Sequence, residues 1–176
     1  SLTEREGIIH MGAAAIIYRN SRILGHYACS IPPVNTHITN KHPGTVKPET
    51  VGAALGAWVA YNKYFRACNL FIDTLAVVNA LREKNFERLV RFDPHAGELL
   101  KELNERKVLN KITWIKGHQK SRSIQSLAND LADKIAEAAR RQARIVGFYE
   151  SLPLLPHHEL QIVSMKDGGE FQLPEY

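Results

Sequence analysis

The sequence predicts an α/β domain in which a mixed β-sheet is flanked by helices. Two observations predict it. Strand-like and helix-like segments alternate after an initial hairpin, as they do when helices pack on a sheet. The length of 176 residues, with 44% hydrophobic and 23% charged residues, is typical of one globular domain with a core of its own. No segment approaches the roughly 18 consecutive apolar residues that a membrane helix needs, so we expect no membrane partner.

The first third of the chain predicts a hairpin and a helix. Residues 12–31 contain two β-rich segments separated by a polar cluster at 19–22, which predicts an antiparallel hairpin. Residues 32–47 are rich in Pro, Asn, Thr, Gly and His, and predict a loop. A helix is expected from Pro48 to about Tyr64, with proline in the first turn, where its missing N–H costs nothing. Small residues give this helix a face that can approach a sheet closely.

The remainder continues the alternation. We expect a strand at 69–73, helices at 75–84 and 95–108, a strand at 111–116 and a long helix at 126–149. From residue 151 the composition shifts to Pro and His, and 160–173 has the pattern of a hairpin with glycines at its turn. The predicted domains are therefore residues 1–146 and a C-terminal extension at 147–176.

Charge and cysteine content narrow the class of partner and compartment. The net charge of +5 favours an anionic partner such as nucleic acid, although basicity alone is weak support. Cys29 and Cys68 lie in apolar surroundings and predict buried free thiols in a reducing, intracellular compartment, the cytoplasm or the nucleus. Trp58 and Trp114 are expected in the core, because one lies mid-helix and the other mid-strand.

Three polar side chains lie where an α/β fold can bring them together. Asp73 ends a buried strand, and the carboxyl ends of strands are where such sheets bind ligands; capping of the next helix is the alternative. Glu49 lies in the first turn of its helix, where the helix dipole alone favours an acid. His118 follows a lysine-glycine turn, and an ordinary loop histidine is the alternative there.

The last helix carries two further acids on opposite sides of its apolar stripe. At about 100° per residue, Asn129 and Asp133 flank one edge of the stripe and Asp130 flanks the other. Either acid can therefore lean towards a sheet, and helix geometry does not choose between them.

Taken together, acids on a helix start, a strand end and the closing helix predict a metal site. Hard oxygen ligands without cysteine or clustered histidine favour Mg²⁺ or Mn²⁺ over zinc. Two such ions, about 3.5–4 Å apart, can hold a phosphodiester while one activates water and the other stabilises the leaving oxygen.

The order of these residues resembles ribonuclease H type 1 domains. The resemblance covers roughly residues 1–142 and is most specific at IDT (72–74) and at KGH and NDLAD within 116–133. Within the family, the chain is most similar to the RNase H domains attached to retrotransposon reverse transcriptases, which implies a parent reverse transcriptase polypeptide. The implied architecture is the RNase H-like fold.

The resemblance also implies roles for individual residues. Glu49, Asp73 and Asp133 match catalytic, metal-binding acids, and it is this match that prefers Asp133 to Asp130. His118 matches a mobile loop histidine that assists proton transfer or product release. Asn129 matches a substrate-contacting residue, and Lys116 is a candidate contact to phosphate.

One feature departs from the family pattern. The family's first strand ends in Asp-Gly-Ser, and its Asp bridges both metal ions. Ser1 matches that serine, so the resemblance implies a truncated N-terminal strand, with its Asp upstream of Ser1 and residues 2–7 as a polar turn. Two metal ions would then share three carboxylates, and we expect this piece to be weak or inactive.

The resulting functional expectation is an endonuclease that hydrolyses the RNA strand of an RNA–DNA hybrid by two-metal catalysis. The 2′-hydroxyl lets such a site distinguish RNA from DNA. The alternative is a non-catalytic RNase H-like module that binds nucleic acid or a partner protein.

Overall fold

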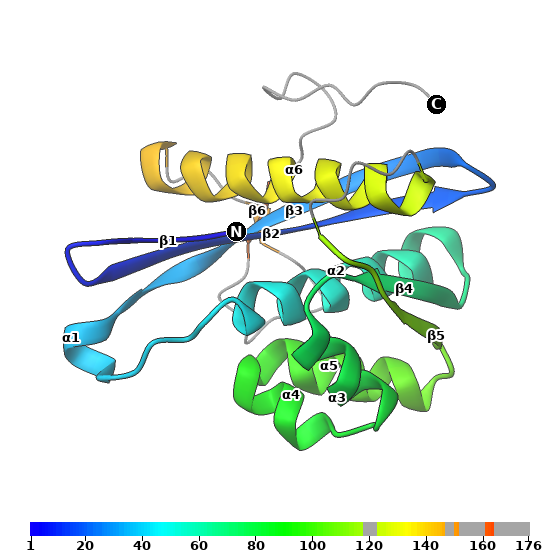
Figure 1. Ribbon diagram of the computed structural model, residues 1–176, viewed down its shortest axis with the longest axis horizontal. Coiled ribbons are helices and arrows are strands. Elements are labelled where there is room, and N and C mark those ends of the chain that lie inside the picture. Colours follow the sequence, from blue (N-terminus) through cyan, green and yellow to red (C-terminus); the bar gives the residue numbers. More distant parts are fainter. Residues whose placement is uncertain (118–122, 147–149, 152–160, 164–176) are drawn as a thin grey trace.

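The strands of the computed structural model form two separate sheets, which helices cover (Figure 1). The structure describes residues 1–117, 123–146, 150–151 and 161–163. One sheet has five strands in the order β1-β2-β3-β7-β6, and the other consists of β4 and β5. The predicted α/β class, with helices flanking the sheets, is confirmed.

The predicted hairpin is the longest part of the first sheet. β2 (Ile8–Arg19) and β3 (Arg22–Asn35) pair antiparallel, with Arg19 opposite Arg22. The two residues between them, Asn20 and Ser21, both have positive φ, the backbone that matches a two-residue turn to the twist of its strands. β3 extends beyond the predicted strand and is followed by the short helix α1 (Thr36–Thr39).

Residues 2–7 are not the polar turn that the sequence predicts. Leu2–Arg5 forms β1, which pairs antiparallel with β2, and the turn is confined to Glu6 and Gly7. Both of these residues have positive φ. The reason is that β2 begins at Ile8, before the expected start at residue 12, so its edge is available to residues 2–5.

Helix α2 (Val46–Tyr64) begins two residues earlier than predicted and packs against β2 through its small residues. A Cβ added at Gly52 would lie 3.1 Å from the carbonyl oxygen of Ala14, and one at Gly56 would lie 3.2 Å from the Cβ of Ala15. The predicted close approach of this helix to a sheet is confirmed.

The long helix α6 (Ile124–Val146) covers the opposite face of β2 and β3 (Figure 1). A Cβ added at Gly12 would overlap the carbonyl oxygen of Ala136, so only glycine permits this approach. Ile135 and Ala139 are fully buried there against Ala28. Helices α2 and α6 therefore enclose β2 between them.

A second group of helices follows β4 (Cys68–Ile72): α3 (Leu75–Arg82), α4 (Phe86–Phe92) and α5 (Pro94–Glu105). The sequence did not predict α4, which is held by its caps. Asn85 Oδ1 accepts a hydrogen bond from the backbone N–H of Arg88 at 3.1 Å, and Asp93 ends α4 and caps α5. β5 (Leu109–Trp114) then pairs in parallel with β4.

Two short strands of the C-terminal extension lie on the first sheet. β6 (Glu150–Ser151) pairs with β7 (Gln161–Val163), and β7 pairs with β3 opposite Ala28, Cys29 and Ser30. The predicted glycine turn at 166–169 lies outside the described residues, and the division at residue 146 stays a prediction. Among the described residues, no helix is long and apolar enough to cross a membrane.

Candidate functional site

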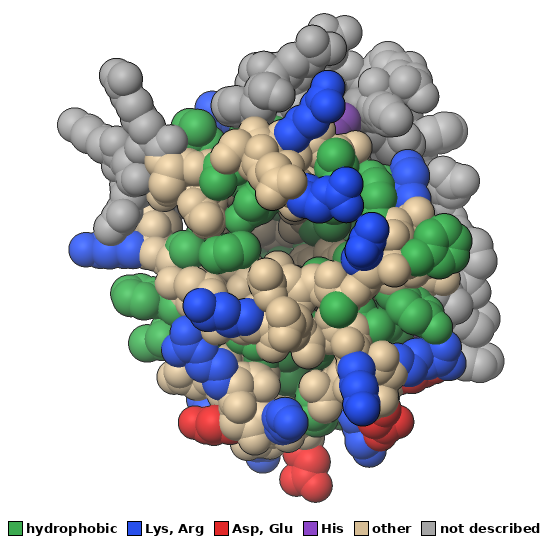
Figure 2. Space-filling model, turned by 90° about the vertical axis from the view of Figure 1, so that its right-hand side faces the viewer, with side chains coloured by type: hydrophobic (Ala, Val, Ile, Leu, Met, Phe, Trp, Pro, Cys, Tyr) green, Lys and Arg blue, Asp and Glu red, His purple; other side chains and the backbone are tan. Residues whose placement is uncertain are grey.

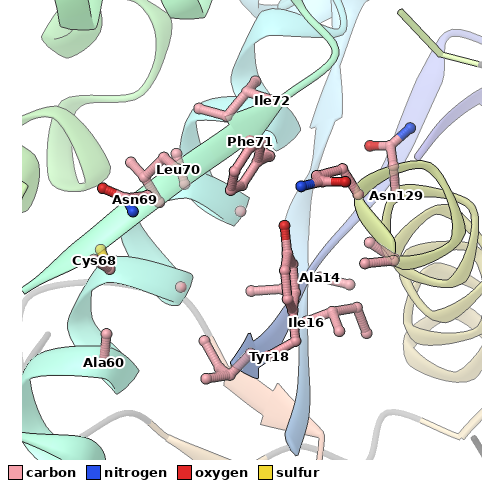
Figure 3. A pocket seen from close by; sticks show the side chains of 18 of the residues that line it. Ala14, Ile16, Tyr18, Ala60, Cys68, Asn69, Leu70, Phe71, Ile72 and Asn129 are labelled. Atoms are coloured by element: carbon pink, nitrogen blue, oxygen red, sulfur yellow. The ribbon is translucent and has the colours of Figure 1, made fainter. Parts of the chain in front are cut away.

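A cavity of about 830 Å³ lies between β2 and β4, where the two sheets are separated from each other. Helix α2 lines one wall and α6 the opposite wall. Figure 3 shows Ala14, Ile16 and Tyr18 of β2 and Leu70, Phe71 and Ile72 of β4 around this gap, with Asn129 on the adjoining helix α6. Segments that are distant in the sequence therefore meet at one place.

The three predicted acids come from three of these segments. Glu49, in the first turn of α2, and Asp133, on α6, both line the cavity. Asp73 follows the last residue of β4, and its Oδ2 accepts a hydrogen bond from Nδ2 of Asn129 at 3.2 Å. The structure thus brings Glu49, Asp73, Asp133 and Asn129 to the same end of the cavity.

The Asn129 contact also shows which side of α6 faces the cavity. Asn129 and Asp133 line it together with small residues of the same helix face, Ala128, Ala132 and Ala136. Asp130 is not among the lining residues. Helix geometry left both acids open, whereas the packing of α6 directs the face that bears Asp133 towards the cavity.

Glu49 has an unusual protonation state. Burial, then the negative charge of Asp73, raise the pKa of Glu49 to about 8; Asp133 and a hydrogen bond with Asp73 act in the same direction. The Ser1 ammonium partly opposes these effects. At neutral pH Glu49 therefore keeps its proton, as one member of a close pair of acids does when both cannot ionise.

We expect this proton to make the stability of the protein depend on pH. The pKa rises from 4.5 to about 8 on folding, so the stabilisation is complete below pH 4.5 and is lost as the pH rises towards 8. Urea unfolding measures the free energy of unfolding at pH 5 and at pH 8.5. Between these two pH values, this free energy should fall less for Glu49→Gln than for the unmodified chain. Glu98→Gln, at an exposed position of α5, is the matched control. Equal losses in all three proteins would contradict the assignment.

The position of Asp73 is fixed from several sides. The indole Nε1 of Trp114 donates to the Asp73 carbonyl oxygen at 3.1 Å, and the Thr74 hydroxyl donates to Asp73 Oδ1 at 3.4 Å. The backbone at Gly117 also lies against it, since a Cβ added there would be 3.1 Å from Asp73 Oδ2. These contacts hold the carboxylate at the carboxyl end of β4.

Trp114 is not the core residue that the sequence predicts, because 42% of it is exposed. β5 pairs only with β4 among the described strands, so β5 is an edge strand and part of its surface faces solvent. The sequence feature that could have indicated a position near the site is that this tryptophan lies two residues before a lysine-glycine turn. Trp58 is partly buried and packs against the core as expected.

The remaining predicted residues lie on the chain that follows β5. Ile115 lines the cavity, Lys116 is exposed, and Gly117 approaches Asp73. His118 lies outside the described residues. The described part of this segment therefore reaches the site at Gly117, beside Asp73.

The acids only partly fit the expected metal ions. Their oxygen atoms are the donors that Mg²⁺ and Mn²⁺ prefer. Within residues 1–117 and the described part of α6, however, no three acidic, histidine or cysteine side chains converge closely enough to hold an ion. Glu49 and Asp73 interact directly, and Asp133 acts on Glu49 as a weaker neighbouring charge. The donor set is incomplete as these residues lie.

Comparison with known proteins bears on the fold. No family model matches the chain, and no curated protein sequence does. Among solved structures, the chain is similar to the PFV RNase H domain determined in solution, with a TM-score of 0.54 and 15% sequence identity. The similarity covers 80% of this chain and 90% of that domain. The chain therefore has an RNase H-like fold, as predicted.

Proposed function

We propose that this protein is an RNase H-type endonuclease that hydrolyses the RNA strand of RNA–DNA hybrids. The main support is that Glu49 and Asp133, from two distant helices, line one cavity of an RNase H-like fold, and that Asp73, at the end of β4, interacts with Glu49 there. Origin in a retrotransposon reverse transcriptase, implied by the sequence resemblance, belongs to the same proposal.

The charge distribution is consistent with a polyanionic substrate. Figure 2 shows a face that is hollowed near its centre, with Lys and Arg side chains arranged around the hollow. Arg19 and Arg66 line the cavity and are exposed. Basic side chains around a cleft raise the local concentration of a phosphate backbone and supply contacts that do not depend on sequence.

Each residue has a distinct role in the proposal. Glu49, Asp73 and Asp133 would hold Mg²⁺ or Mn²⁺, together with a further acidic donor. When bound, two such ions supply an activated water and charge stabilisation at the leaving oxygen. Asn129 orients Asp73 through its hydrogen bond. Lys116 is assigned to a phosphate contact and His118 to proton transfer.

The proton on Glu49 links metal binding to pH. A protonated carboxyl group is a poor cation ligand, so Glu49 must lose its proton before it can donate an oxygen. Because its pKa is about 8 in the absence of metal, binding of Mg²⁺ should tighten as the pH rises towards that value and should release a proton.

A direct test uses the chain preceded by a short hydrophobic strand that ends in Asp-Gly, joined to Ser1. With Mg²⁺ and a labelled RNA–DNA hybrid, we expect cleavage of the RNA strand that leaves 3′-hydroxyl and 5′-phosphate ends. Asp133→Asn should lose about a hundredfold or more in rate, the scale of a lost transition-state contact, and Asp130→Asn should keep its activity. Equal rates for these two variants would show that the site is misplaced.

The incomplete donor set also supports a second candidate function. Without a bound metal ion, an RNase H-like module can still bind nucleic acid or a partner protein through its basic face. The same assay separates the two functions. Tight binding of the hybrid by the strand-extended chain, with no cleavage in either Mg²⁺ or Mn²⁺, would establish the binding module and reject the hydrolase.

A further inference from the structure

A group of basic side chains lies at the end of the molecule opposite to the acids. Three connections meet at this end: the β2–β3 turn, the chain between α2 and β4, and the chain between α5 and β5 (Figure 1). At about 1.5 Å per residue, α2 separates Glu49 from Tyr64 at its other end by about 22 Å. At about 3.4 Å per residue, β2 separates Gly12, which bonds to Ser1 near the acids, from Arg19 by about 24 Å. The basic group therefore lies too far from the acids to contact the same phosphate.

Hydrogen bonds hold the three connections together. The Tyr64 hydroxyl, at the end of α2, donates to the Leu24 carbonyl oxygen of β3 at 3.3 Å. The Cys68 N–H donates to the Val108 carbonyl oxygen at 2.8 Å, and this bond joins the chain after α2 to the chain before β5. The three connections therefore form one continuous surface.

Basic residues dominate these connections. Segments 19–27, 60–70 and 106–111 contain no Asp or Glu. Arg106 is neutralised by its ion pair with Glu102. The other basic side chains of these segments are exposed and unpaired with any acid in the part of the chain that the structure describes; we call them the distal basic face, and they are Arg19, Arg22, Lys63, Arg66, Lys107 and Lys111. Figure 2 shows Lys and Arg side chains around the hollow, with the acidic side chains in the lower part of the view. Such a surface fits a polyanion.

Phe65 is the second feature of this surface. It follows the last residue of α2 with a φ of 53°, the left-handed conformation that favours glycine at the end of a helix. Its side chain is 85% exposed, so burial in the described chain does not offset the strain. It directly precedes Arg66 and lies two residues after Lys63. An exposed aromatic ring among cations is the arrangement that binds single-stranded nucleic acid, because a base stacks on the ring while phosphates meet the cations.

Two tyrosines hold Lys63 in place. Its Nζ lies 5.3 Å from the ring centroid of Tyr27 and 5.9 Å from that of Tyr64. The hydroxyl oxygens of the two tyrosines are 3.3 Å apart and share a hydrogen bond. These contacts restrict the Lys63 ammonium while it stays exposed, which reduces the entropy lost when it meets a phosphate.

We propose that the distal basic face and Phe65 together bind a single-stranded segment of nucleic acid. Its phosphates contact the cations, and one of its bases stacks on Phe65. The bases of a duplex already stack on each other and cannot cover this ring, so an unpaired segment is the better fit. The choice of nucleic acid over other polyanions rests on the proposed function, whereas the position of the surface rests on the structure alone.

Fluorescence anisotropy tests this binding apart from cleavage. The probe is a labelled oligothymidylate of about twelve nucleotides, within the length that such surfaces cover, mixed with the unextended chain in the absence of metal ions. We expect Phe65→Gly to weaken binding about tenfold, as the loss of one stacked base does. Affinity equal to that of the unmodified chain would overturn the proposal.

The same variant distinguishes a contact with the ligand from damage to the fold. Glycine adopts the left-handed conformation at this helix end without strain, so Phe65→Gly should unfold at a higher temperature than the unmodified chain. Phe65→Trp keeps a flat ring and should bind the oligothymidylate at least as tightly as the unmodified chain. Equal weakening by the Gly and Trp variants would reject stacking at this position.

The salt dependence of binding tests the cations. Lys63→Gln combined with Arg66→Gln should reduce the slope of log affinity against log salt concentration by about 0.7 for each phosphate contact that is lost. Lys101→Gln is the matched control, since Lys101 is exposed on α5 outside the distal basic face. Equal slopes for the double variant and this control would show that the oligothymidylate binds elsewhere.

A glutamate peptide of the same charge tests the other class of polyanion. We expect it to bind more weakly than the oligothymidylate, because it has no base to stack on Phe65. Binding of the peptide that is equally tight and unchanged in Phe65→Gly would identify an acidic protein segment as the partner and would reject nucleic acid.

The outcomes separate this inference from the proposed activity. Oligothymidylate binding that depends on Phe65, without hybrid cleavage by the strand-extended chain, would retain the distal basic face and reject the hydrolase. Hybrid cleavage by that chain, with oligothymidylate binding that does not depend on Phe65, would retain the hydrolase and reject this surface.

Discussion

Replacing Asp73 with Asn is expected to reduce hybrid cleavage by the strand-extended chain about a hundredfold or more. Asn has nearly the same shape and keeps a carbonyl oxygen, but it loses the negative charge that cation binding needs and that, after burial, contributes most to the raised pKa of Glu49. The same substitution should therefore lower the pKa of Glu49 and weaken the binding of Mg²⁺. Single-turnover cleavage and calorimetric titration with Mg²⁺ measure the two effects separately.

Thr74→Val is the matched control for this variant. It removes the 3.4 Å hydrogen bond to Asp73 Oδ1 but keeps the carboxylate and its contact with Asn129. We expect it to cleave the hybrid at a rate within a few-fold of the unmodified protein. If Asp73→Asn cleaves the hybrid at the same rate as Thr74→Val, Asp73 takes no part in the reaction, whatever the outcome of the Mg²⁺ titration.

Most of the helices and strands could be predicted because the residues that favour them lie within or directly beside each segment. The β-rich segments of β2 and β3 flank a polar turn, and Pro48 lies in the first turn of α2. By contrast, α4 has seven residues and depends on Asn85 and Asp93 for its caps, and a segment of that length has little helix signal of its own. β1 was missed because its stability comes from pairing with β2, which composition does not reveal.

The candidate site was predictable only as a set of residues. Glu49 and Asp73 lie at the ends of a helix and a strand, where an α/β fold can bring acids together. The same positions are equally typical of acids that only stabilise the start of a helix. Asp130 and Asp133 flank the same stripe, and the hydrogen bond from Asn129 to Asp73 was needed to orient the helix. The separation of β2 from β4 is a property of pairing between distant segments, so no single stretch of sequence contains it.

The buried ion pair between Lys47 and Asp93 should have the largest effect on stability. Asp93 is 2% exposed, and its Oδ2 caps α5 by accepting from the Ala96 N–H at 2.9 Å, while its Oδ1 pairs with the Lys47 ammonium. Asp93→Ala removes the cap and leaves the Lys47 side chain, itself only 19% exposed, without this carboxylate. Breaking a buried pair on one side costs about 3–5 kcal/mol.

Urea unfolding of Asp93→Ala should therefore show a free energy of unfolding lower by about 3–5 kcal/mol. Glu102→Ala is the control, since it breaks an exposed pair with Arg106 and should cost at most about 1 kcal/mol. Lys47 lies two residues before Glu49 in the first turn of α2, so the pair also fixes the helix start that presents Glu49 to the cavity. A loss in Asp93→Ala no larger than that in Glu102→Ala would show that α5 and α2 are held together by apolar packing instead.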